Sequence, residues 1–189
     1  MTTTNSAVMT RRDCLRGLST LALGGLLLPR WAGASLLADQ AERSLSFVHT
    51  HTGERLRRVY WAEGEYLPSV LNEFNFLMRD FRNGSVLAMD TQLLDQLAVL
   101  QAKLGRSCDF HIISAYRSPE TNAMLRANSN GVARHSMHLD GKAMDIRVPG
   151  VALSQVHSAA LAMQAGGVGY YPGSDFVHVD TGRVRSWGG

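Results

Sequence analysis

Two short polar segments in the second half of the chain restrict how it can fold, because their side chains are expected to meet. Residues 136–145 have the sequence SMHLDGKAMD, in which His138 and Asp145 lie seven positions apart across a glycine-containing turn. Residues 176–180 have the sequence FVHVD, an alternation of apolar and polar side chains that is typical of a strand and includes His178. Asp145 has apolar neighbours on both sides, and a buried carboxylate without a cation or several donors is costly. We therefore expect a fold that brings the two segments side by side.

Two imidazoles and one carboxylate form a ligand set that suits zinc. Catalytic zinc sites commonly keep three protein ligands and leave a fourth position for water, whose pKa zinc lowers to about 7. His138, Asp145 and His178 therefore predict a zinc site that can support hydrolysis. Gly141 permits the close turn, and Ala143 leaves room beside the site. Taken alone, His138 is more often a histidine that a backbone partner satisfies, and it is the combination that favours a metal.

Two further side chains are candidates for the chemistry. Asp180 shares the His178 face of an alternating strand, although a turn-capping carboxylate before Thr181 is an equal alternative. Arg117 follows a predicted strand and precedes a predicted helix, where strand ends commonly contribute to sites. Its planar guanidinium can polarise a carbonyl or bind a carboxylate, whereas the residue type alone favours an ordinary surface arginine.

The other histidines predict no second site of comparable strength. His49 and His51 form a His-x-His pair that can be imagined as a rival zinc site, but no carboxylate at a suitable spacing completes it. His135 lies beside the main segment and is either a substrate contact or merely exposed. We expect His111 and His157 to be structural or surface residues.

The first 34 residues predict an export signal that does not belong to the fold. Arg11 and Arg12 lie in a charged head, an apolar run follows from Leu18 to Leu28, and small residues precede position 35. This order matches a twin-arginine signal peptide, with cleavage expected after Ala34. The alternative is an uncleaved membrane anchor, but the apolar run falls short of the roughly 20 residues that span a bilayer. We therefore expect a domain of residues 35–189 with no stable membrane span.

The composition that remains after the signal narrows the classes of protein. Four of the 19 basic and one of the 16 acidic residues lie before residue 35, which leaves fifteen of each. This balance, together with the lack of a block of like charge, argues against nucleic acid as a partner. Cys108 is then the only cysteine, so no internal disulfide can form, and we expect it to be inert. About 155 residues suffice for one domain with a sizeable core and are too few for two.

The spacing of apolar residues predicts an α+β order, in which helices dominate the first half and a mostly antiparallel sheet the second. A hairpin is expected before the first helix. The expected strands are residues 45–48, 56–61, 110–116, 143–148, 168–171 and 176–180, and the expected helices are residues 67–82, 91–104, 119–128 and 153–164.

The pattern Ser-x-His-x-x-Gly-x-Ala-x-Asp of residues 136–145 resembles the zinc D-alanyl-D-alanine peptidases, which include vancomycin-resistance dipeptidases and penicillin-insensitive murein endopeptidases. Every fixed position is met, and His178 corresponds to the third zinc ligand of that family. Residues 114–118, SAYRS, look like the family's arginine segment, which implies that Arg117 binds the substrate carbonyl. The chain from about Ser44 to Trp187 looks closest to the exported murein endopeptidase K branch.

The resemblance implies a periplasmic zinc metallopeptidase whose substrates are the peptide cross-links of peptidoglycan. It also implies a compact α+β domain with a central, mostly antiparallel sheet flanked by helices. His138, Asp145 and His178 would hold Zn²⁺ in such an enzyme. The resemblance does not say whether the bond cut joins D-alanine to diaminopimelate or two diaminopimelates, nor whether the enzyme is an endopeptidase or a carboxypeptidase.

The general base is left open by a departure from the family pattern. Many relatives place a glutamate three residues before the last ligand, and this chain has the shorter Asp175 there. Other relatives have a histidine two positions before that ligand, where this chain has Phe176. Asp180 is the rival candidate and is slightly favoured by strand geometry.

Two other functions compete with hydrolysis. The missing glutamate motivates the first alternative, a peptidoglycan-binding protein that keeps the fold and the metal but turns over little or no substrate. An exported metal-binding or structural domain unrelated to the cell wall is the weaker alternative, because the motif is specific.

Overall fold

The computed structural model describes residues 34–188, apart from residues 39, 106 and 129–131. The predicted signal peptide lies outside the described residues except for its last residue, Ala34, which begins helix α1 (Ala34–Ala38). Leu37 of this helix is 3% exposed and belongs to the hydrophobic core. Within the described part of the chain, no helix is both long enough and apolar enough to cross a membrane.

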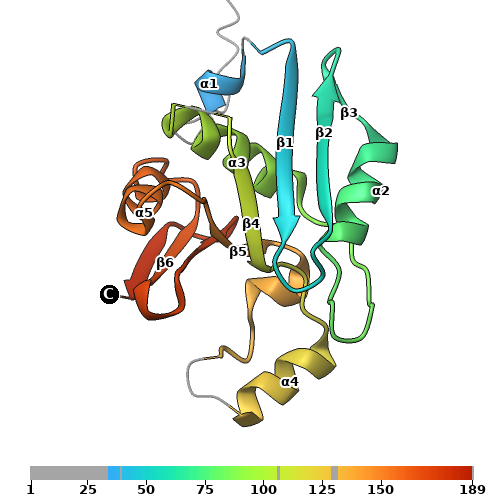
Figure 1. The fold of residues 1–189 in the computed structure, drawn as a ribbon, viewed down its shortest axis with the longest axis vertical. Helices are drawn as coiled ribbons and strands as arrows, with labels where there is room; N and C mark the ends of the chain where they lie inside the picture. The colour runs from blue at the N-terminus through green and yellow to red at the C-terminus, as the bar shows by residue number, and fades with distance from the viewer. Residues whose placement is uncertain (1–33, 39, 106, 129–131, 189) are drawn as a thin grey trace, which may run out of the picture.

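The described strands form one sheet in the order β3-β2-β1-β4-β5-β7-β6-β8 (Figure 1). Most neighbouring strands are antiparallel, and the β1–β4 and β6–β8 pairs are parallel. The predicted α+β class with a mostly antiparallel sheet is therefore confirmed. The strands are β1 (Glu42–His49), β2 (Arg55–Ala62), β3 (Glu65–Tyr66), β4 (Asp109–Ser114), β5 (Ala143–Arg147), β6 (Gly167–Tyr171), β7 (Phe176–Asp180) and β8 (Arg185–Gly188).

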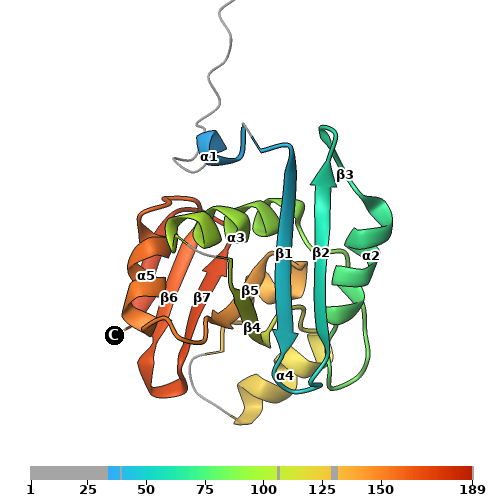
Figure 2. The same ribbon diagram turned by 45° about the horizontal axis from the view of Figure 1, so that its top comes forward.

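Helices lie along the sheet and at one end of it (Figures 1 and 2). Contacts join α2 to β2, α3 to β1, and α5 to β6 and β7. The side chain of Asp90 caps α3 by accepting a hydrogen bond from the backbone N–H of Gln92 at 3.0 Å, as the sequence predicts. The longer helices are α2 (Pro68–Leu77), α3 (Thr91–Lys103), α4 (Pro119–Asn128) and α5 (Leu153–Leu161), and a short 3₁₀ turn, η2 (Met137–Asp140), precedes β5.

The two faces of the sheet have different compositions. Apolar strand residues form one core cluster with Leu93 and Leu97 of α3 and Val156 of α5. Alternate residues of a strand point to opposite faces, so the polar residues between these apolar ones lie on the other face. That second face therefore carries the candidate site. The strand residues of this core cluster that are no more than 2% exposed are Leu45, Phe47, Tyr60, Phe110, Ile112, Met144, Ile146, Val177 and Val179.

Two predicted helices are too long. The helix expected over residues 153–164 ends at Leu161. The helix expected over residues 67–82 ends at Leu77, because the following residues form a loop that is bonded to the chain after β4. Asp80 is 1% exposed and accepts hydrogen bonds from the backbone N–H of Ser118 at 2.9 Å and of Arg82 at 3.1 Å. These hydrogen bonds satisfy the buried carboxylate and fix the loop after Leu77 against the chain that follows β4.

Candidate metal centre

The three predicted metal ligands come from β5, β7 and the turn before β5. Asp145 and His178 are direct partners across the β5–β7 pair. His138 lies in η2, where the side chain of Ser136 accepts a hydrogen bond from its backbone N–H at 3.4 Å. Gly141 ends this turn with a φ of 66°, and a Cβ at that position would lie 2.7 Å from the carbonyl oxygen of Ala88. The glycine that the sequence pattern places here is therefore required by both the backbone conformation and the space.

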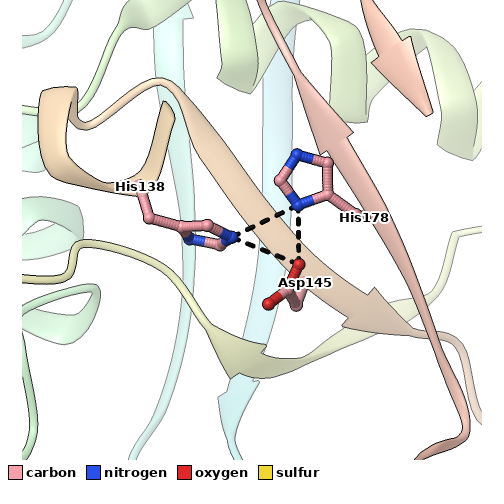
Figure 3. Close-up of side chains that lie close together, drawn as sticks. All are labelled: His138, Asp145 and His178. Carbon is pink, nitrogen blue, oxygen red and sulfur yellow. Dashed lines mark hydrogen bonds and ion pairs between the residues drawn. The ribbon is translucent and has the colours of Figure 1, made fainter. Parts of the chain in front are cut away.

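The ligand atoms of these residues converge to a single point (Figure 3). Nε2 of His138 lies 3.3 Å from Oδ1 of Asp145 and 3.2 Å from Nδ1 of His178. Nδ1 of His178 lies 2.8 Å from the same oxygen of Asp145. With bonds of about 2.0–2.1 Å, the ligands of a tetrahedral zinc ion lie about 3.3 Å apart. The donor set and its spacing thus fit zinc. Only the distance between Nδ1 of His178 and Oδ1 of Asp145 would have to lengthen, from 2.8 Å.

Each histidine has a partner for the ring nitrogen that faces away from this point. Nδ1 of His138 lies 2.6 Å from the carbonyl oxygen of Ala115, which can only accept, so the proton is on Nδ1 and Nε2 is free to bind a metal. Nε2 of His178 likewise lies 3.0 Å from Oδ2 of Asp180, which leaves Nδ1 free to bind a metal. Such outer partners fix the tautomer and the orientation of metal-binding imidazoles.

Asp180 is held by more donors than any other carboxylate near the site. Its side chain is fully buried and faces Nε2 of His178 at 3.0 Å. Arg185 donates to both of its oxygens, from NH1 at 3.0 Å and from NH2 at 2.6 Å. The backbone N–H groups of Gly167 and Gly182 donate to Oδ1 at 3.0 and 2.8 Å. Both oxygens of Asp180 are thus committed to protein donors, and the carboxylate is fixed in place.

The electrostatics of the site keep its carboxylates ionised. Burial alone would raise the pKa of Asp145, but the adjacent His138 and His178 outweigh it and hold the pKa below its ordinary value. Burial also opposes ionisation of Asp180, and hydrogen bonds from His178, Arg185 and the backbone again leave a lowered pKa. Burial alone would lower the pKa of His178, but hydrogen bonds to Asp145 and Asp180 outweigh it and leave the pKa raised.

Arg117 borders the same group of side chains. Its NH2 lies 3.9 Å from Oδ2 of Asp145, the oxygen that does not face the histidines. The hydrogen bonds of its guanidinium to Asn122 and Ser114 are long, at 3.4 Å each, and its buried Nε has no hydrogen-bond partner among the described residues. Burial lowers the pKa of Arg117, with Asp145 opposing this effect. The guanidinium is therefore fixed beside the site and retains capacity to donate.

A cleft of about 580 Å³ opens onto this centre. It is lined by predicted residues and also by an aromatic wall of Tyr171, Phe176 and Trp187. Of these three, the sequence pattern marks Phe176 alone, as the position at which other relatives have a histidine. Trp187 could have been identified from its spacing, because it follows Arg185 by two residues in the last strand and therefore shares its face of the sheet. The other side chains that line the cleft are Arg117, Val132, Ala133, His135, Ser136, Met137, His138, Asp145, Ser174, His178 and Arg185.

Asp175, the other predicted carboxylate, has a different setting. It follows a short 3₁₀ turn, has a φ of 53°, and its side chain is 62% exposed. Its Oδ2 forms an ion pair with NH1 of Arg147 at 2.9 Å. Asp175 does not itself line the cleft, although its neighbours Ser174 and Phe176 both do.

The rival histidine pair lies apart from the metal centre. Nδ1 of His49, which is 1% exposed, accepts hydrogen bonds from the backbone N–H of His51 and Thr52, both at 3.3 Å. The ring of His51 stacks on Phe81 with centroids 4.1 Å apart. Among the described residues, the group of His138, Asp145 and His178 is the one whose atoms are close enough to share a metal. His49 and His51 are therefore explained by packing.

Comparison with known proteins gives consistent matches over nearly the whole chain. A family model described as peptidoglycan L,D-endopeptidase MepK matches residues 38–187. Peptidoglycan L,D-endopeptidase MepK of Escherichia coli (strain K12) is 44% identical over 176 residues, which cover 93% of this chain and 96% of the relative. The probable peptidoglycan L,D-endopeptidase MepK of Haemophilus influenzae is 42% identical over 173 residues, with 91% and 92% covered. No solved structure matches the chain. On this likeness, the chain belongs to the peptidoglycan L,D-endopeptidase MepK family.

Proposed function

We propose that this chain is a zinc-dependent endopeptidase that hydrolyses peptide cross-links of peptidoglycan. The observation that carries the proposal is the convergence of three ligand atoms, from His138, Asp145 and His178, at the wall of an open cleft. Residues 35–189 form the catalytic domain in this proposal. The relatives' name and the family membership support the class of substrate.

The three ligands would hold Zn²⁺ through Nε2 of His138, Oδ1 of Asp145 and Nδ1 of His178. Bound zinc supplies a Lewis acid that polarises a carbonyl and lowers the pKa of water to about 7. The hydrogen bond of His138 to Ala115 orients the first imidazole, and that of His178 to Asp180 orients the second. Asp180 acts in this proposal as a positioning residue, because its oxygens already accept hydrogen bonds from several protein groups.

Arg117 binds the carbonyl oxygen of the bond that is cut. It lines the cleft, and its guanidinium lies close to Oδ2 of Asp145 but makes only long hydrogen bonds elsewhere. A planar cation that is already desolvated stabilises negative charge on that oxygen without a large rearrangement.

Asp175 is the proposed proton acceptor. Its competitor Asp180 is fully buried and fully bonded, whereas Asp175 is 62% exposed, and its one ion pair is with the partly exposed Arg147. Exposed ion pairs contribute roughly 0–1 kcal/mol, so this pair can open at little cost. Asp175 also lies between two residues that line the cleft, and it has the position at which many relatives carry a glutamate.

The bond cut is proposed to have the L,D configuration for which the relatives are named. A cross-link between two diaminopimelates joins an L centre to a D centre, whereas a cross-link from D-alanine to diaminopimelate joins two D centres. Purified soluble dimers of the two kinds separate these possibilities. We expect cleavage of the diaminopimelate–diaminopimelate dimer, loss of cleavage with a chelator, and recovery when zinc is returned.

Digestion of whole sacculi tests the function in its natural context. Release of cross-linked material by the zinc-loaded protein is expected, with the muropeptides separated before and after treatment. An unchanged profile with zinc bound stoichiometrically would contradict the enzyme and favour the peptidoglycan-binding protein, which the replacement of glutamate by Asp175 motivates.

The proposed location of the chain is the periplasm, and the proposed route is twin-arginine export. The support is the order of charged, apolar and small residues within positions 1–34. Replacing Arg11 and Arg12 by lysine together should leave an uncleaved precursor in the cytoplasm, detected by fractionation. Normal processing of that variant would point to a different export route.

A further inference from the structure

The cleft has an aromatic wall on the β6–β8 side of the metal centre, formed by Tyr171, Phe176 and Trp187. Tyr171 and Phe176 are partners across β6 and β7, and their rings stack with centroids 4.5 Å apart. The indole of Trp187 lies against the ring of His178, with centroids 5.1 Å apart. The wall therefore begins at a metal ligand and continues along the cleft.

Trp187 fixes the hydroxyl group of Tyr171. The indole Nε1–H donates a hydrogen bond to Oη of Tyr171 at 2.7 Å. Since an indole nitrogen can only donate, the phenol oxygen is the acceptor, and its own O–H still needs an acceptor. Within the described part of the chain, no residue accepts a hydrogen bond from this hydroxyl. Its O–H is therefore available to an oxygen atom of a molecule bound in the cleft.

Glycine at position 169 permits this arrangement. A Cβ at Gly169 would lie 2.7 Å from the indole of Trp187, so a larger residue would displace the ring. Gly169 is also the partner of His178 across β6 and β7, which places the indole directly beside the metal ligand. The guanidinium of Arg185 lies 4.8 Å from the centre of the same indole and is itself held by Asp180. The indole of Trp187 therefore packs on the backbone at Gly169 and has the guanidinium of Arg185 beside it.

The charge of the cleft suits an anionic group. Among the described residues, Asp145 is the one carboxylate that lines the cleft, and it belongs to the metal site. Arg117 and Arg185 line it as permanent cations. Arg185 is paired with the buried Asp180, so a carboxylate brought to the aromatic wall meets mainly the Tyr171 hydroxyl as a donor. Besides Asp145, no acidic side chain lines the described cleft.

We propose that Tyr171, Phe176 and Trp187 form the subsite for the diaminopimelate on the acyl side of the cross-link, and that the Tyr171 hydroxyl donates to its distal carboxylate. This inference rests on the function proposed above. The acyl-side residue is what differs between the two cross-links. Diaminopimelate offers a methylene chain that covers aromatic rings and ends in a carbon that carries a carboxylate and an ammonium group, whereas D-alanine offers a methyl group. The wall thereby favours the diaminopimelate–diaminopimelate bond.

The experiment removes the two partners of the proposed hydrogen bond separately and together. Tyr171→Phe keeps the ring stack and removes the O–H group. L-Lysine is diaminopimelate without the distal carboxylate, so a synthetic dimer with lysine on the acyl side removes the other partner. We expect Tyr171→Phe to lower kcat/KM about 10-fold on the diaminopimelate dimer, mainly by raising KM, and less than about 2-fold on the lysine dimer.

The neighbouring Tyr170→Phe is the matched control. Tyr170 is on the other face of β6, packs against the core, and stacks on His157 with centroids 4.5 Å apart. This variant should change neither substrate's kcat/KM. Equal losses on both dimers for Tyr171→Phe, or no loss on either, would overturn the subsite.

A binding measurement keeps this test independent of turnover. Calorimetry measures the affinities of the unchanged protein and of Tyr171→Phe, both loaded with zinc. The ligand is a diaminopimelate dimer whose scissile amide is replaced by a reduced, uncleavable bond. We expect about 10-fold weaker binding by Tyr171→Phe. If the unchanged protein cleaves no dimer, the proposed function fails, while equal affinities of the two proteins would overturn the subsite by itself.

Discussion

The two ends of strand β7 carry carboxylates in opposite physical settings. Asp180 at one end has a fully buried side chain and is bonded to His178, Arg185 and two backbone N–H groups. Asp175 precedes the other end, is 62% exposed, and has one ion pair, with Arg147. A carboxylate that is saturated with donors holds its neighbours in place, whereas one that can leave its partner can accept and return a proton. The two carboxylates thus have different proposed roles: Asp180 positions His178, and Asp175 accepts and returns a proton.

Replacement of a proposed metal ligand should have the largest effect on cleavage, and the effects of changes at both ends of β7 are compared with it. His138→Ala should abolish stoichiometric zinc binding and reduce cleavage of the soluble dimer to background, because two ligands remain for a site that needs three. The fold should persist, as judged by circular dichroism. His157→Ala is the control, since His157 stacks on Tyr170 outside the metal site and should leave zinc and activity intact. Retained cleavage by the His138 variant would contradict the zinc mechanism.

The exposed end of β7 should be the more sensitive one in turnover. Asp175→Asn should lower kcat by about 10²–10⁴-fold with unchanged zinc content, the range that general acid–base groups contribute. Asp175→Glu should retain measurable activity because it restores the residue that many relatives have. Metal analysis and steady-state kinetics on the same preparation separate the two effects. Activity of the asparagine variant within about 3-fold of the unchanged protein would show that the base lies elsewhere.

The buried end should be the more sensitive one in metal binding. Asp180→Asn should weaken zinc about 10–100-fold, because the outer partner of His178 changes from a carboxylate to an amide. Competition with a chelator of known affinity measures the change. At saturating zinc, most of the cleavage activity should return. A loss of kcat that persists at saturating zinc, with normal zinc stoichiometry, would reverse the assignment of the two carboxylates.

The pH dependence of stability offers a second measure of the buried end. The pKa of Asp180 is lowered from its ordinary 3.8, because hydrogen bonds from His178, Arg185 and the backbone outweigh the effect of burial. Its contribution to stability is therefore present above pH 3.8 and is lost as the pH falls through the lower folded value. Denaturant unfolding of the metal-free protein should show a gap in the free energy of unfolding between it and Asp180→Asn that narrows as the pH falls below about 4. A gap that widens between pH 4 and pH 2 would contradict this account.

The sequence predicts the centre of the site better than its surroundings. The three proposed ligands can be selected from the sequence because alternation within residues 176–180 and the turn at Gly141 are local properties of the chain. The end of α2 at Leu77 could not be predicted, since the loop after it depends on Asp80 meeting Ser118, 38 residues away. Apolar periodicity alone continues past that point.

The aromatic wall illustrates the same limit on the other side of the centre. Trp187 reaches the cleft because β8 pairs in parallel with β6, a pairing that no local pattern encodes. The proposed role of Asp180 also depends on contacts outside its own strand, since its donors include the backbone of Gly167 and the side chain of Arg185. Strand alternation correctly places Asp180 on the His178 face, but it cannot show that protein donors already occupy both oxygens.

The smallest expected effect concerns the partner of the exposed carboxylate. Arg147→Gln removes the ion pair with Asp175, whose two side chains are 40% and 62% exposed. Such pairs contribute roughly 0–1 kcal/mol, so the free energy of unfolding should change by less than about 1 kcal/mol. Because the variant releases Asp175 from a competing partner, kcat should rise or stay within about 3-fold, as measured on the soluble dimer. A fall of more than about 10-fold with zinc still bound would mean that Arg147 holds Asp175 in its active position, and that the two ends of β7 are both fixed.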